Sequence, residues 1–254
     1  MKKLFIILVW LNLILFLGGC SIFQSENTKK ENQTQTLGDS NEISISSRMG
    51  DIKIFQCKGD VLSFSAVKRV KVNDKDLRNK IMDNINIHTE IKGKKVIISA
   101  LTKDNLDVWK WKQENYNSAN ISIDYELRIP EKINIYTVNT GMGNIDLEEI
   151  KGEINAHTDM GEVKLSKVVF TGKNDISTNS GNAALNISSI EQAESINVSA
   201  DLGDISLKVP NNAKYNLETK ISNNVSKHQI INGGGTKLKV VADLGLIKIN
   251  GKSQ

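Results

Sequence analysis

A short glycine-centred motif recurs along the chain and constrains the fold more than any other feature. In most copies an apolar residue precedes the glycine and alternating apolar and polar residues follow it, as in Met160-Gly161-Glu162-Val163-Lys164-Leu165. From the second copy onward the glycines are 18, 20, 22 and 42 residues apart, and the last step equals two periods of 21. The glycines are Gly50, Gly143, Gly161, Gly181, Gly203 and Gly245.

Glycine adopts backbone angles that other residues resist, so we interpret these six positions as structural turns between strands. A single period cannot bury its apolar face, whereas stacked periods bury a shared apolar column. The repeat therefore predicts an all-β fold, specifically a β-solenoid (β-helix-like) of ~20-residue rungs. The irregular steps leave open an alternative, a sandwich built from short hairpins.

One segment departs from the alternation that is typical of strands. Over 74–85 the apolar residues Leu77, Ile81 and Ile85 recur every four residues, which places them on one helix face. Asn73 is suited to the N-cap, and the acidic residues that follow it suit the positive end of a helix dipole. We therefore expect one short helix near residues 74–85.

The first twenty residues have the pattern of a bacterial export signal. Lys2 and Lys3 precede the apolar run 4–17, which is too short to span a bilayer and fits a signal peptide. The run ends in Leu-Gly-Gly-Cys20, which resembles the lipobox of bacterial lipoproteins. The sequence predicts a lipoprotein signal peptide over 1–19 and lipidation of Cys20 by acyl chains such as palmitate. The alternative is an uncleaved anchor with an incidental cysteine.

The organisation of the mature chain follows from this signal. Residues 20–41 are polar and lack periodicity, so we expect the lipidated cysteine and a flexible tether there. Residues 42–251 are then a single β-strand-repeat domain. Because two or more acyl chains give stable anchoring, we expect a location in the bacterial cell envelope, on the outer face of the membrane. The role of the remaining thiol, Cys57, stays open between a buried strand residue and a reactive group.

The order of these elements resembles that of a known bacterial family. Alternating strands lead to Leu127-Arg128-Ile129-Pro130, and the glycine repeats come after it. Over residues ~42–251 the chain resembles the putative-adhesin or β-strand-repeat domain family, whose function is unknown. The resemblance implies a β-helix-like fold and an envelope location, and some relatives are linked to adhesion or envelope stress. It supplies no catalytic residues.

Acidic residues of the repeat are the main candidates for chemistry. Asp146, Glu162 and Asp204 lie near the turns, and enzymes that cleave polysaccharides need two or three converging carboxylates. Acidic residues are also common in turns, and we favour that interpretation. The three histidines lack metal-ligand spacing. We therefore expect no enzyme, no metal and no cofactor, and a net charge of +4 is too small to predict a nucleic-acid partner.

The segment 104–120, DNLDVWKWKQENYNSAN, interrupts the strand pattern. It contains Trp109, Trp111 and Tyr116, with lysines interleaved, and such a mixture suits sugar rings, lipid headgroups or a partner surface. The alternative is that the tryptophans cap the exposed end of the solenoid. A spacing of two would place both tryptophans on one side of a strand, which fits either role.

Together these features favour a non-catalytic, lipid-anchored cell-surface protein that acts as an adhesin or envelope-interaction module. Its expected partners are the membrane, through Cys20, and a cell-wall, glycan or protein component. Two other hypotheses remain: a β-helix enzyme that acts on polysaccharide, and an envelope-stress sensor or decoy. The sequence does not identify the ligand, the oligomeric state or the handedness of the coil.

Overall fold

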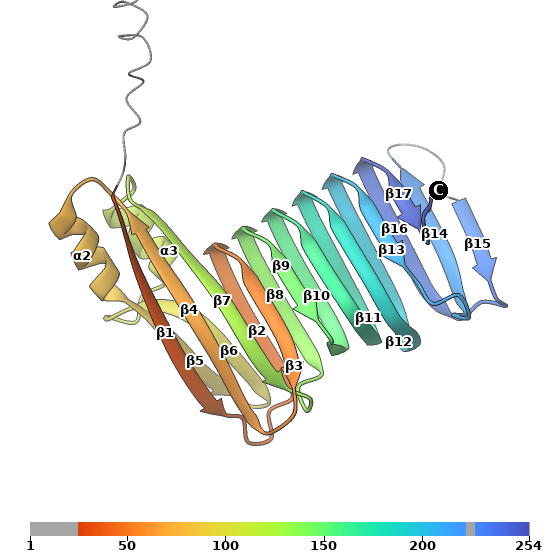
Figure 1. The fold of residues 1–254 in the computed structure, drawn as a ribbon, viewed down its shortest axis with the longest axis horizontal. Coiled ribbons are helices and arrows are strands. Elements are labelled where there is room, and N and C mark those ends of the chain that lie inside the picture. The colour runs from red at the N-terminus through yellow and green to blue at the C-terminus, as the bar shows by residue number, and fades with distance from the viewer. Residues whose placement is uncertain (1–24, 222–226, 254) are drawn as a thin grey trace, which may run out of the picture.

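The expectation of an all-β chain is confirmed in the computed structural model, which describes residues 25–221 and 227–253 (Figure 1). The predicted signal peptide and Cys20 lie outside the described residues. The strands are β1 Glu26–Thr36, β2 Glu42–Met49, β3 Ile52–Cys57, β4 Val61–Lys71, β5 Ile85–Lys92, β6 Lys95–Thr102, β7 Asn120–Pro130, β8 Ile135–Met142, β9 Ile145–Glu148, β10 Lys151–Met160, β11 Val163–Ser180, β12 Ala183–Leu202, β13 Ile205–Lys208, β14 Tyr215–Ile221, β15 Lys227–Ile231, β16 Thr236–Leu244, β17 Ile247–Ile249 and β18 Lys252–Ser253. The helices are α2 Lys75–Asn84 and α3 Val108–Asn115.

The strands pair in two rows that enclose one apolar core. The first row runs β5-β6-β2-β8-β10-β11-β12-β16-β14-β15, and the second runs β1-β4-β7-β3-β9-β11-β12-β13-β17-β18. Strands β11 and β12 are long enough to contribute their first residues to the second row and their last residues to the first. Buried residues from both rows belong to a single cluster, so the sheet folds back on itself.

Successive repeats pair in parallel and bring equivalent apolar residues together. In the first row the aligned residues are Val138, Ala156, Ile176, Val198 and Val240. In the second row they are Ile145, Val163, Ala183, Ile205 and Ile247. All ten are buried. Alternate residues of a strand face the same side, so this register keeps every polar neighbour out of the core.

The repeat glycines form the corners where the chain passes from the first row to the second. Gly161 has φ +150°, and a Cβ at this position would lie 2.1 Å from the carbonyl oxygen of Gly143, one repeat away. At the other five glycines the distance to a carbonyl oxygen is 1.8–2.1 Å; the oxygen belongs to the preceding corner glycine except at Gly50, which faces the Ile123 oxygen of β7. The backbones of neighbouring corners therefore approach more closely than any side chain allows, which explains why glycine recurs there.

Side chains next to these glycines satisfy backbone groups that the corner leaves without strand partners. The Asn144 Oδ1 accepts a hydrogen bond from the Glu162 backbone N–H at 2.8 Å, and the Asn182 Oδ1 accepts one from Asp204 at 2.9 Å. The Asp51 carboxylate accepts from the Asn144 N–H at 2.8 Å. Short polar side chains thus link one corner to the next.

The helix expected near 74–85 is present as α2, and its N-cap is Asp74 rather than Asn73. The Asp74 carboxylate accepts from the Leu77 N–H at 2.9 Å, and Ile81 is fully buried against the core. The expectation of only one helix is wrong, because α3 lies within the segment that interrupts the strand pattern.

The expectation of a flexible tether over 20–41 is also wrong for Glu26–Thr36. These residues form β1, which pairs antiparallel with the whole of β4. Glu31 of this strand forms an ion pair with Lys68, whose ammonium group is buried and also donates to the Ile85 carbonyl at 2.6 Å. The polar strand thus supplies the carboxylate that this buried cation requires. Within the described residues, no helix combines the length and apolar character needed to cross a bilayer.

Candidate functional site

Helix α3 places Trp109 beside the outer face of the first row. The helix begins after Asp107, whose carboxylate accepts from the Lys110 N–H at 2.8 Å, and Val108 anchors its first turn in the core. Trp109 follows Val108 directly, and its side chain is half buried against the edge of the core. The two tryptophans therefore do not share one side of a strand, since the segment is helical.

Trp111 and Tyr116 differ from Trp109 in their surroundings. Their rings are 5.0 Å apart in an edge-to-face arrangement, and both rings pack against the core. They contribute to neither of the clefts that Trp109 lines. Their packing fits the covering role that the sequence left open, whereas Trp109, which also packs against the core, lines the clefts.

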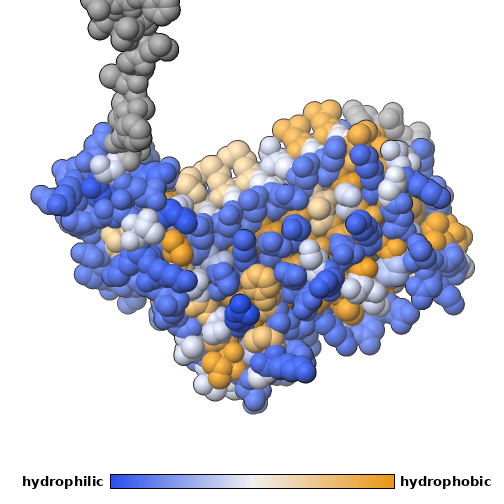
Figure 2. Space-filling model, in the orientation of Figure 1, coloured by the Kyte–Doolittle hydropathy of each residue, from blue (hydrophilic) through white to orange (hydrophobic). Residues whose placement is uncertain are grey.

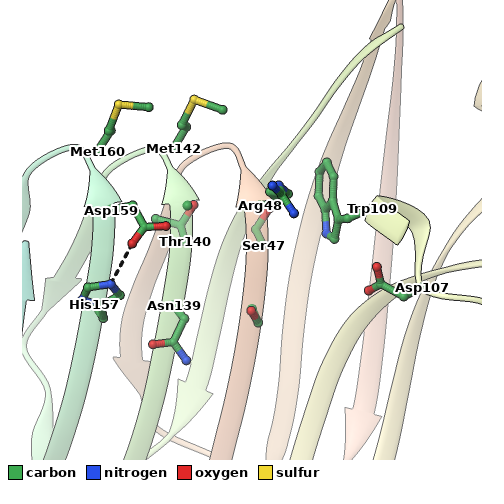
Figure 3. A pocket seen from close by; sticks show the side chains of 12 residues that line it. Ser47, Arg48, Asp107, Trp109, Asn139, Thr140, Met142, His157, Asp159 and Met160 are labelled. Atoms are coloured by element: carbon green, nitrogen blue, oxygen red, sulfur yellow. Dashed lines mark hydrogen bonds and ion pairs between the residues drawn. The ribbon is translucent and has the colours of Figure 1, made fainter. Parts of the chain in front are cut away.

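A cleft of about 630 Å³ lies between α3 and the ends of β2, β8 and β10 (Figure 3). Trp109 and Asp107 form one wall, and Arg48 at the end of β2 lies next to the indole. Asn139 and His157 project from the neighbouring strands on the other side. The remaining lining residues are Ser46, Ser47, Thr140, Gly141, Met142, Asp159 and Met160.

Hydrogen bonds hold the far wall of this cleft. The two ring nitrogens of His157 contact the Ser177 Oγ at 2.9 Å and the Asp159 Oδ1 at 3.0 Å. Asn179 donates to the same Asp159 oxygen at 3.1 Å. The imidazole is therefore fixed in orientation, and one Asp159 oxygen stays available to a ligand because the residue is exposed.

Three side chains of the cleft are unengaged. Across residues 25–221 and 227–253, Ser46, Arg48 and Asn139 make no side-chain hydrogen bond or ion pair. Together they offer a hydroxyl, a guanidinium and an amide on one side of a half-buried indole. Sequence reasoning found Trp109 but missed these residues, since they lie on strands that meet only in the folded sheet.

A second cleft of about 220 Å³ adjoins the first. It shares Arg48, Trp109 and Met142 with the larger cleft and adds Lys112 and Gln113 of α3. Trp109 therefore lines two neighbouring clefts.

The candidate catalytic carboxylates are only partly brought together. Asp146 and Glu162 line a pocket of about 230 Å³ on the second row, together with Asp51 and two lysines. Asp204 does not line this pocket, and its carboxylate accepts from the Leu246 N–H at 2.9 Å, as a corner residue does. The described residues contain no group of three or more His, Cys, Asp or Glu side chains arranged to hold a metal. Cys57, the last residue of β3, is half buried with a free thiol.

Comparisons with known proteins give a limited result. No family model matches the chain, and no curated protein matches its sequence. One similar solved structure is described as a putative cell adhesion protein from Clostridium sporogenes, with 14% identity and a TM-score of 0.39 over 88% of this chain and 99% of that one. Another is described as a putative adhesin from Bacteroides fragilis, with 16% identity and a TM-score of 0.33 over 87% and 97% of the two chains.

Proposed function

We propose that the protein is a non-catalytic binding module of the bacterial cell envelope, lipid-anchored through Cys20, and that the Trp109 cleft binds a glycan. The carrying observation is the half-exposed indole of Trp109, which shares one cleft with unengaged polar side chains. The anchor rests on the lipobox-like sequence before Cys20. The role is that of an adhesin or envelope-interaction module, in which recognition rather than chemistry is the activity.

The chemistry of the cleft supports a sugar ligand. An indole offers a flat apolar face to the C–H groups of a pyranose ring, while hydroxyl groups require donors and acceptors around it. Arg48 supplies donors, Asp159 supplies an acceptor, and Asn139 supplies both. A volume of about 630 Å³ lies within the ~300–1,000 Å³ range of ordinary small-molecule sites.

We also infer that the repeat region is a β-solenoid of ~20-residue rungs. The parallel pairing of β8, β10, β11, β12 and β16 supports this architecture, as do the stacked glycine corners. In this interpretation the antiparallel strands β4 and β7, with α2 and α3, cover the first rung. The cleft then lies at the junction between the covering segment and the regular rungs.

Binding of full-length protein in mild detergent to an array of bacterial and host glycans tests the proposal. We expect binding to a defined sugar sequence, and a loss of affinity of at least tenfold in Trp109→Ala. Lys110→Ala is the matched control, since Lys110 is the next residue of α3 and lines neither cleft. Glycan binding that Trp109→Ala leaves unchanged would place the site elsewhere, and silence across the array would refute a glycan ligand.

One observation favours a second candidate, an enzyme acting on polysaccharide. Asp51, Asp146 and Glu162 line a common pocket beside Lys53 and Lys164, so carboxylates and cations do meet on the second row. A screen for release of reducing ends from cell-surface polysaccharides tests this candidate. Activity that Glu162→Gln abolishes and Trp109→Ala spares would favour it over the binding module.

A further inference from the structure

A row of apolar side chains projects from the glycine corners, and we call it the apolar ridge. It consists of Met142, Met160, Leu202, Leu244 and Leu246, whose exposed fractions range from 37% to 65%. The first four precede a corner glycine, and Leu246 follows the last one. Figure 2 shows orange atoms along the corresponding upper edge of the molecule.

The corner geometry aligns these side chains. Backbone hydrogen bonds of 2.9 Å connect Gly143 to Met160 and Gly203 to Leu244, so residues before the glycines follow the same ladder as the strands. With ~4.8 Å between neighbouring strands, Met142 and Leu244 lie ~19 Å apart along the edge. One step between them carries Ser180 instead of an apolar residue. The ridge is thus a row along one edge, interrupted once at Ser180, rather than a set of scattered exposed residues.

The described chain begins at this same edge. Glu26 of β1 pairs with Lys71, and Lys71 pairs with Asn120 at the start of β7. Strands β3 and β7 are parallel, and Ile52, just after the Gly50 corner, pairs with Tyr125. The residues of β7 before Tyr125 therefore extend past that corner. Figure 1 shows β1 starting at the edge where the corners lie and running away from it.

The anchor residue is close to this point in the sequence. Cys20 precedes Ser25, the first described residue, by five positions. Five residues span at most ~18 Å when fully extended. A lipid on Cys20 therefore holds the edge that carries the ridge, and not the opposite edge, near the membrane.

We propose that the protein lies along the bilayer, with the leucine end of the apolar ridge, Leu202, Leu244 and Leu246, in contact with the outer leaflet that holds its anchor, while Met142 and Met160 border the Trp109 cleft. This proposal rests on the lipid anchor of the proposed function. The anchor fixes one end of the edge, and Leu202, Leu244 and Leu246 provide a second contact at the far end. The direction in which the strands are stacked then runs parallel to the membrane plane, and each strand runs roughly along the membrane normal.

Charges beside the ridge set the kind of lipid surface it tolerates. Asp159, Asp201 and Asp243 each precede a ridge residue directly, and Asp204 lies beyond the Gly203 corner. All four are exposed. These carboxylates keep the contact shallow and repel anionic lipid. The ridge should therefore settle on zwitterionic headgroups, and anionic lipid should loosen it at low salt.

Polarised infrared spectroscopy of the lipidated full-length protein on a supported phosphatidylcholine bilayer tests this orientation. The backbone carbonyls of a sheet point along the hydrogen-bond direction, so their dichroism reports how the stacking direction lies. We expect the carbonyls to lie in the membrane plane. The variant Leu202→Ser/Leu244→Ser/Leu246→Ser should lose this order and remain bound through its lipid.

The matched control is Val61→Ser/Ile91→Ser/Ile230→Ser, which removes three exposed apolar side chains near the opposite ends of the strands. It should keep the wild-type dichroism. Carbonyls along the membrane normal in the wild type, or equal dichroism in the wild type and the leucine variant, would overturn the orientation and leave the anchor standing. Protein that washes off the bilayer would overturn the anchor and the orientation together. Replacing part of the lipid with phosphatidylglycerol should reduce the order, and added salt should restore it.

Discussion

Replacing Gly161 by alanine tests the explanation of the repeat directly. A Cβ at this position lies 2.1 Å from the Gly143 oxygen, whereas a carbon and a carbonyl oxygen in contact stay ~3.3 Å apart. The two corners must therefore separate by roughly 1.2 Å. The hydrogen bonds from Gly143 N–H to Met160 and from Ile145 N–H to Glu162, both 2.9 Å, then exceed the range of a hydrogen bond.

The cost follows from these two bonds and from the backbone angle. Two hydrogen bonds at about 1 kcal/mol each, with about 1–3 kcal/mol for a side chain at φ +150°, give about 3–5 kcal/mol. Gly59→Ala is the control, because Gly59 has φ +108° and no atom lies within 4 Å of its added Cβ. That variant should lose only the backbone strain, about 1–3 kcal/mol.

The free energy of unfolding from urea denaturation separates the two contributions. We expect Gly161→Ala to be less stable than Gly59→Ala by about 2 kcal/mol, the value of the broken ladder bonds. Hydrogen exchange should also show faster opening at the adjacent corners than elsewhere. Equal losses in the two variants would refute the argument from close approach and leave only the backbone angle as the reason for glycine.

Three further predictions concern the buried polar groups. Tyr125→Phe should be neutral or stabilising by about 1 kcal/mol in thermal denaturation, because its buried hydroxyl has no partner among the described residues. Tyr136→Phe should instead cost about 1 kcal/mol, because it loses the 2.7 Å hydrogen bond from the hydroxyl to the Ile133 carbonyl. Burial raises the pKa of both phenols above the ordinary value of 10.0. The unfolded state therefore releases these protons first, and the free energy of unfolding should fall as pH rises above 10. Ultraviolet titration that shows both phenols ionised in folded protein near pH 10 would contradict this. Glu31→Ala should destabilise by about 3–5 kcal/mol, because it leaves the buried Lys68 ammonium without its carboxylate, and a loss below 1 kcal/mol would show that this ion pair does not stabilise the fold.

The repeat was predictable from sequence because glycine acts locally there. The close approach at a corner excludes every residue with a Cβ, so the constraint is written in the sequence at each repeat. The helix α2 was predictable for a similar reason, since Leu77 and Ile81 keep one face apolar over several turns. In both cases one physical requirement determines one residue type at a regular spacing.

Strand β1 escaped prediction because its inward side chains are polar. Alternation is present in its burial, but the side chains that point inward include Glu31 and Gln33. Their partners are the Lys68 ammonium and the Ile87 carbonyl, which the Gln33 amide meets at 2.9 Å. Hydropathy cannot distinguish such a strand from a polar tether, because its stability comes from specific partners elsewhere in the chain.

Helix α3 carried a signal that the spacing of the tryptophans obscured. Asp107 is a good N-cap, and the Lys, Gln and Glu residues after Val108 favour helix. Two tryptophans separated by one residue suggested a strand, but Trp109 and Trp111 instead lie on different sides of a helix turn. The N-cap signal at Asp107 was local and could be read from the sequence. The position of Arg48 beside Trp109 depends instead on the tertiary fold.

The position of the cleft follows from where the repeat is interrupted. Parallel rungs of equal length give faces that repeat with little relief, so a concave site requires a segment that breaks the repetition. That break occurs between β3 and β8, where the antiparallel strands and both helices are inserted. As a result β2 pairs with β8 across this insertion, and α3 stands beside the paired strands. Arg48 and Asn139 line the same cleft as Trp109 because each lies on a strand at the boundary between the insertion and the regular array. A change that shortened α3 while sparing the glycine corners should therefore abolish the cleft and leave the parallel strands of the repeat paired.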